Sequence, residues 1–153
     1  MTTEIGPLTV RRSVWINAPP ERVWREFESF ERMKAWFGTG HELTKYEPVL
    51  GGSVEMYAGP ASEEHPWELR FGGPILVFDP PRELTFENNW FGSDWVAPSL
   101  ITFRLTLALE GTVVELFHHG LERIGSTAGE MLRGFEGGWT TRHLEELRQI
   151  VEG

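Results

Sequence analysis

The stretch Ile16–Gly38 reads INAPPERVWREFESFERMKAWFG and decides the fold. It follows residues 8–16, where apolar side chains recur at every second position, a pattern that is typical of a strand. Pro20 suits the first position of a helix, because the backbone N–H that proline lacks has no partner there. A short helix is therefore expected after the double proline, with one apolar stripe made of Val23, Trp24 and Phe27.

The remainder is predicted to be a second short helix, then short strands, then one long helix. The second helix covers 31–37 and ends at Gly38. Strands are indicated at 43–49, 54–57, 67–71 continuing through 75–78, 84–86, 101–109 and 114–118, with a loop at 88–98 and a hairpin turn at Glu110-Gly111. Apolar residues at helical spacing follow Thr127, namely Met131, Leu132, Phe135, Trp139, Leu144, Leu147 and Ile150. Gly134, Gly137 and Gly138 interrupt this stripe and suggest a kink, a late helix start or a close approach to another surface.

This order predicts an α+β fold in one domain, residues 1–153. Successive hairpins indicate an antiparallel sheet of about six or seven strands, curved around the long C-terminal helix. The chain is long enough to bury a core without disulfides or metals, and it contains no cysteine.

Charge and hydropathy exclude several classes of partner. The net charge of −9 disfavours nucleic acid and anionic membrane surfaces, both of which attract basic patches. There is no apolar run of about 20 residues and no N-terminal apolar segment of a secretory signal, so we expect a cytoplasmic protein without membrane insertion.

Four segments carry a resemblance to a known family. They are Ala18–Trp24 (APPERVW), Trp36–Gly38 (WFG), Asp79–Phe86 (DPPRELTF), and a closing portion of His118-x-Gly120, Gly138-Trp139 and Leu144–Leu147. In this order and spacing they are similar to the START/Bet v-type helix-grip superfamily (SRPBCC), and more narrowly to proteins related to the activator of the heat shock protein 90 ATPase. The resemblance covers roughly residues 10–151 and implies a helix-grip fold with an internal cavity between the sheet and the C-terminal helix. The chaperone activators of that family carry a further N-terminal domain, for which this chain has no room, so we do not expect chaperone ATPase activation here.

Seven tryptophans and ten phenylalanines are many for 153 residues, and such rings line cores and ligand cavities alike. The residues expected around a hydrophobic small molecule are Trp24, Trp36, Phe71, Phe86, Asn88, Phe103, Leu116, His118, Phe135, Trp139 and Arg142. His143 is an alternative to Arg142, because either position follows Trp139 around the helix. Trp90, Phe91 and Trp95 lie in an expected loop, where a cavity rim, a lid and a contact in a homodimer are three open alternatives.

His118 is the candidate catalytic residue. Alternation in the last strand puts it on the face of Leu116, toward the cavity, and puts His119 on the opposite face in solvent. There it either orients a ligand or acts as an acid or base, or it is a core histidine with hydrogen-bonded neighbours. Arg104 and Glu115 are expected to form a cross-strand pair on the outside.

No other chemistry is indicated. The five histidines, 41, 65, 118, 119 and 143, lack metal-ligand spacing, and the nucleophile elbow and the phosphate-binding loops are missing, so no metal or cofactor is expected. The preferred hypothesis is binding of a lipid-like or aromatic molecule. The alternatives are a cyclase/dehydratase-like enzyme that uses His118, as other helix-grip proteins imply, and a module that interacts with a chaperone.

Overall fold

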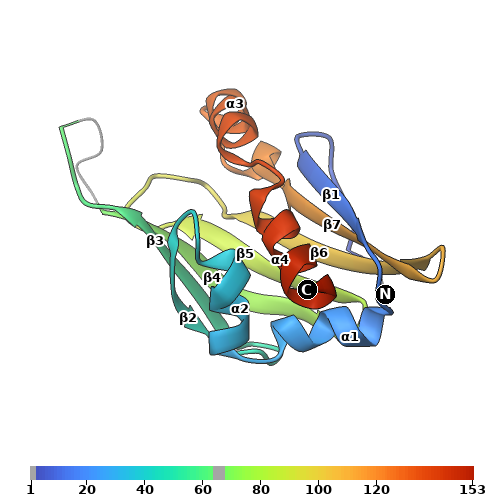
Figure 1. The fold of residues 1–153 in the computed structure, drawn as a ribbon. Coiled ribbons are helices and arrows are strands. Elements are labelled where there is room, and N and C mark those ends of the chain that lie inside the picture. Colours follow the sequence, from blue (N-terminus) through green and yellow to red (C-terminus); the bar gives the residue numbers. More distant parts are fainter. Residues whose placement is uncertain (1–2, 64–67) are drawn as a thin grey trace.

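The computed structural model describes residues 3–63 and 68–153 and contains a seven-stranded antiparallel sheet (Figure 1). Its strands are β1 (Val10–Ile16), β2 (Glu42–Tyr46), β3 (Ser53–Gly59), β4 (Leu69–Asp79), β5 (Glu83–Trp90), β6 (Ser99–Ala108) and β7 (Gly111–His119). The order across the sheet is β1-β7-β6-β5-β4-β3-β2, so the first strand pairs with the last. The predicted α+β class and the curved antiparallel sheet are confirmed.

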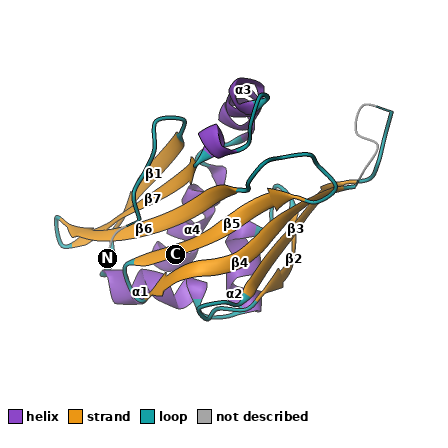
Figure 2. Cartoon of the chain, turned by 180° about the vertical axis from the view of Figure 1, so that it is seen from behind, coloured by secondary structure: helices purple, strands orange, loops and turns teal. Residues whose placement is uncertain are grey.

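The helices gather on the concave face of the sheet. They are α1 (Pro20–Trp24), α2 (Phe30–Phe37), α3 (Ala128–Gly138) and α4 (Arg142–Glu152), with single 3-10 turns η1 (Arg25–Phe27) and η2 (Leu121–Arg123). Figure 2 shows the sheet from its other side, with α1, α2 and α4 behind it and α3 rising beyond its end. The fold is therefore a sheet that grips α4, as expected.

The core between sheet and helices is built of rings. Phe103 of β6 meets three other aromatic rings edge-on, at centroid distances of 5.5 Å to Phe27, 5.4 Å to Trp36 and 5.3 Å to Phe37. The Trp36 indole N–H donates to the main-chain carbonyl of Glu26 at 3.0 Å, so its polar atom is satisfied inside the core. The segment 16–38 thus supplies the rings at the centre of the packing.

The C-terminal helical segment spans residues 128–152 but is interrupted at Trp139. This residue has an extended backbone (φ −83°, ψ 122°), which separates α3 from α4. The guanidinium of Arg12 on β1 donates to the carbonyls of Glu136 (2.9 Å) and Trp139 (3.1 Å). These carbonyls end a helix and lack intrahelical partners, so Arg12 holds the end of α3 on the sheet. The glycines thus mark a kink, one of the three predicted alternatives.

Three local predictions are corrected or limited. The hairpin turn lies at Leu109 and Glu110, whose φ values of 53° and 64° match a two-residue turn with both central residues left-handed, and not at Glu110-Gly111. Leu109 is 88% exposed, because this hairpin runs past the helices (Figure 1). β5 continues through Trp90 into the stretch expected to be a loop. Trp67, expected to begin β4, lies outside the described residues.

Candidate functional site

A pocket of about 250 Å³ lies between the concave sheet and the junction of α3 with α4. Four strands supply its floor: β3 through Met56 and Ala58, β4 through Phe71, β5 through Asn88 and β7 through His118. The remaining walls come from the α2–β2 loop and from the C-terminal helices through Gly40, His41, Phe135, Gly138, Trp139 and His143. The pocket remains open because small residues such as Ala58 and Gly138 lie beside the rings that line it.

The predicted site residues divide into two groups. Phe71, Asn88, His118, Phe135 and Trp139 line this pocket. The others are placed elsewhere: Trp24, Trp36, Phe86, Phe103 and Leu116 are buried in the hydrophobic core, and Arg142 is exposed on α4. Its guanidinium donates to Glu146 (3.2 Å) and to the carbonyl of Thr39 (3.3 Å).

His118 is held by hydrogen bonds whose directions can be assigned. The Trp139 indole N–H, which only donates, points at His118 Nδ1 at 2.8 Å, so Nδ1 carries the lone pair. In the neutral ring Nε2 is therefore protonated, and it donates to Ser99 Oγ at 2.7 Å. Ser99 Oγ in turn donates to the main-chain carbonyl of Asn88 at 3.1 Å. These hydrogen bonds hold the Trp139 ring in its position in the pocket wall.

Burial keeps the ring of His118 neutral. The side chain is 1% exposed, and desolvation, with a smaller contribution from His119, lowers its pKa from 6.5 to about 3. Both ring nitrogens are already bonded to protein groups. His118 thus has the geometry of a positioning residue, which holds Trp139.

Asn88 is a deeply buried polar residue of the pocket whose hydrogen bonding is incomplete. It is 2% exposed, and its Oδ1 has no hydrogen-bond partner among the described residues. Its Nδ2 lies 3.4 Å from His118 Nε2, an atom that already carries a proton. A buried amide that lacks a hydrogen-bond partner is unfavourable unless another molecule supplies one.

Two more histidines stand at the opposite wall. His41 and His143 lie with ring centroids 5.2 Å apart, and Nδ1 of His143 donates to the Trp36 carbonyl at 3.0 Å. Burial, reinforced by His143, lowers the pKa of His41 to about 4, and burial also lowers the pKa of His143. Nε2 of His41 has no hydrogen-bond partner among residues 3–63 and 68–153.

The aromatic segment 90–95 meets the pocket at Phe135. The Phe135 ring lies 6.4 Å from Trp95 and 6.3 Å from Phe71, and Trp95 lies 6.0 Å from Trp90. Trp90, Phe91 and Trp95 are not among the residues that line the pocket, so the segment adjoins it through Phe135, and the three alternatives for its role stay predictions. Five of the lining residues were not predicted as site residues, namely Gly40, His41, Met56, Ala58 and Gly138, and His143 was predicted only as an alternative to Arg142. His41 follows the Gly38 stop in a loop, where no periodicity indicates which way a side chain points.

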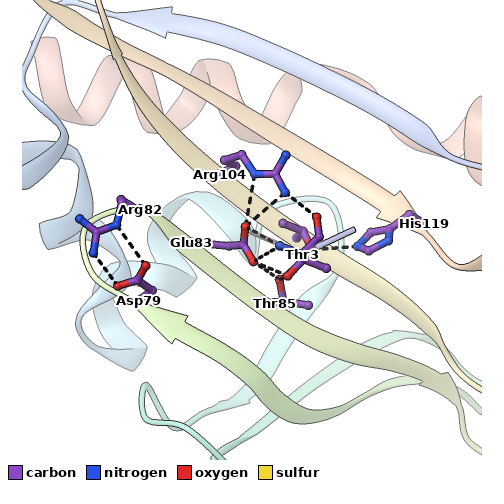
Figure 3. Close-up of polar contacts among 8 residues, drawn as sticks. Thr3, Asp79, Arg82, Glu83, Thr85, Arg104 and His119 are labelled. Carbon is purple, nitrogen blue, oxygen red and sulfur yellow. Dashed lines mark hydrogen bonds and ion pairs between the residues drawn. The ribbon is translucent and has the colours of Figure 1, made fainter. Parts of the chain in front are cut away.

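The opposite face of the sheet carries a separate polar cluster (Figure 3). The Arg104 guanidinium binds the Glu83 carboxylate at 3.2 Å and the carbonyl of Thr3 at 2.9 Å, and Thr3 also donates to Glu83. Arg104 lies opposite Glu115 in register, as predicted, but the ion pair of Glu115 is with Arg11. The cluster attaches the N-terminal segment to the sheet.

His119 belongs to this second face. It points away from the pocket, as predicted, but the expectation that it lies in solvent is wrong, because it is 1% exposed. Its Nε2 lies 2.8 Å from Thr102 Oγ1, which is itself 2.8 Å from Thr85 Oγ1. These side chains satisfy one another, which is the pattern of a structural network.

Among the described residues no group of histidines and carboxylates is placed to hold a metal ion, and His65 lies outside that part of the chain. Within the same residues no helix has the length and apolar character that crossing a bilayer requires.

Comparison with known proteins identifies a family and several solved structures with a similar fold. Residues 17–152 match the family model described as activator of Hsp90 ATPase homolog 1-like protein. Among solved structures, protein MLL2253 from Mesorhizobium loti is 20% identical with a TM-score of 0.69, over 94% of this chain and 96% of that chain. Protein CV1439 from Chromobacterium violaceum has the same identity and TM-score, over 97% and 99%. The Aha1 dimer from Colwellia psychrerythraea is 13% identical with a TM-score of 0.61, over 94% and 96%. No curated protein matches the sequence, and at these identities the solved structures share the fold alone.

Proposed function

This chain belongs to the activator of Hsp90 ATPase homolog 1-like family, and on that premise we propose that it binds a hydrophobic small molecule in the pocket between its sheet and the α3–α4 junction. One observation carries the proposal. The core around Phe103 is filled with interlocking rings, whereas a space of about 250 Å³ remains under Phe135 and Trp139. Its walls are mainly apolar, with few polar groups, as in small-molecule sites.

The volume favours a compact occupant. A cavity of about 150 Å³ accommodates benzene, so about 250 Å³ fits a compound of about two fused rings. Such a compound buries about 150–250 Å², which contributes about 4–6 kcal/mol at 25 cal/mol per Å². We therefore expect a Kd between about 40 µM and 1 mM for a simple two-ring probe.

The enzyme alternative lacks comparable support. An acid or base at His118 needs a ring nitrogen within reach of the substrate. Here Nδ1 accepts from Trp139 and Nε2 donates to Ser99, and the ring is neutral. His118 is better explained as a residue that positions the pocket wall.

Binding is tested by calorimetric titration with phenol, indole and 2-naphthol. We expect saturable binding at one site per chain, with 2-naphthol tightest. In the Ala58→Trp variant the new ring occupies the pocket from β3, and binding is lost. The matched control is Ala35→Trp, on an exposed position of α2 outside the pocket, which retains binding. Failure of all three probes to bind, or binding that survives Ala58→Trp, contradicts the proposal.

A further inference from the structure

We infer that the occupant of this pocket is an uncharged molecule with one hydrogen-bonding oxygen, and that the side-chain amide of Asn88 recognises that oxygen. The inference rests on the proposed binding function and narrows it to a class of ligand. It excludes carboxylic acids and amines of the same size.

The lining argues for an uncharged ligand. None of the described residues that line the pocket is Lys, Arg, Asp or Glu. Its three histidines are neutral near pH 7, since burial lowers the pKa of each. Arg142, the cation at the start of α4, is already bound to Glu146 and to the Thr39 carbonyl outside the pocket. A carboxylate or ammonium group would lose its hydration here without gaining a partner of opposite charge.

The Asn88 amide argues for one oxygen on that ligand. The Trp139 donor fixes the tautomer of His118, so Nε2 of His118 carries a proton and offers no lone pair to Asn88 Nδ2. Exchanging the two ends of the amide brings Oδ1 toward this N–H and turns the NH₂ group to the place where Oδ1 has no partner. In either orientation the end of the amide that is turned away from His118 lacks a protein partner. A hydroxyl group can pair with that end whether it is the carbonyl or the NH₂ group, because a hydroxyl both donates and accepts.

The test compares four probes that share one ring system: naphthalene, 2-naphthol, 2-naphthoate and 2-naphthylmethylammonium. In the wild-type protein near pH 7 we expect 2-naphthol to bind about tenfold more tightly than naphthalene, because it gains a buried hydrogen bond. Both charged probes should bind at least about tenfold more weakly than 2-naphthol.

The variant Asn88→Leu keeps the size of the side chain and removes the amide. Affinity for 2-naphthol should fall about tenfold, whereas affinity for naphthalene stays the same or rises. Asn89→Leu is the control, because its side chain points to the other side of β5 and does not line the pocket. Chemical denaturation of both variants checks that they are folded.

The outcomes separate this inference from the proposed function. The role of Asn88 is refuted if 2-naphthol binds no more tightly than naphthalene, or if Asn88→Leu lowers the affinity for both probes equally. In either case the pocket remains a binding site. If 2-naphthoate binds as tightly as 2-naphthol, the uncharged class is refuted. If no probe binds, the proposed function itself fails.

Discussion

Replacing His118 with glutamine should make the protein less sensitive to acid. Glutamine does not titrate, and its amide accepts from the Trp139 indole and donates to Ser99 as the imidazole does. Near pH 7 the variant should lose about 1–2 kcal/mol through poorer packing and geometry. The informative quantity is how this difference changes as the pH falls.

The magnitude follows from the pKa of His118, which burial lowers from 6.5 in the unfolded chain to about 3 in the folded protein. Between these values the unfolded chain binds a proton that the folded chain does not, so stability is complete above about pH 6.5 and falls as the pH decreases toward 3. Each pH unit corresponds to about 1.4 kcal/mol. From pH 6.5 to pH 4.5 the wild type should therefore lose about 2 kcal/mol more than the variant, because the unfolded histidine is already half protonated at pH 6.5.

The assay is urea denaturation of both proteins at several pH values from 7 to 4.5. The acid-sensitive groups His41 and His119, whose pKa values burial lowers to about 4, remain in both proteins and cancel in the comparison. The variant should approach or exceed the wild type in stability at pH 4.5. Parallel pH dependences would refute the reasoning, because they would mean that His118 is protonated in the folded state and not held neutral beneath Trp139.

Other changes test the packing. Trp139→Phe leaves the buried Nδ1 of its histidine partner without a donor, so the free energy of unfolding should fall by about 1–3 kcal/mol in urea denaturation, and an unchanged value would argue against that bond. Phe103→Ala should cost about 3–5 kcal/mol, against less than about 0.5 kcal/mol for Val96→Ala at a position 82% exposed; similar losses in the two would contradict a solid core there. Gly72→Ala should destabilise strongly, because φ is +150° and the new Cβ would lie 2.0 Å from a carbonyl oxygen of β3. Gly134→Ala, in open space within α3, should stabilise by about 0.5–1 kcal/mol, and the reverse order of melting temperatures would refute both assignments.

Much of the fold could be predicted because the sequence patterns are local. The period-two run of β6 and the apolar stripes after Pro20 and Thr127 each indicate one element, and their order predicts a sheet gripping a helix. The neighbouring glycines indicated that the C-terminal helix is interrupted. The interruption lies at Trp139 because Arg12 and His118, which are distant in sequence, bind this residue.

The pocket could be predicted less well because it depends on how rings fill space. Alternation shows that Phe86, Phe103 and Leu116 face inward, but it does not show that the helices cover them completely. Phe71 and Phe135 face the same interior, yet the small side chains of Gly40, Ala58 and Gly138 leave room beside them. His119 illustrates the same limit, since its face was predictable and its burial by the polar network was not.

The most direct test is a crystal structure of the protein with 2-naphthol. We expect the two rings of naphthol between Phe135 and Trp139 on one side and Phe71 on the other, with the naphthol oxygen within hydrogen-bond distance of the Asn88 amide. Naphthol bound elsewhere, or rings of α3 that close over the space and leave no room for it, would contradict binding in this pocket.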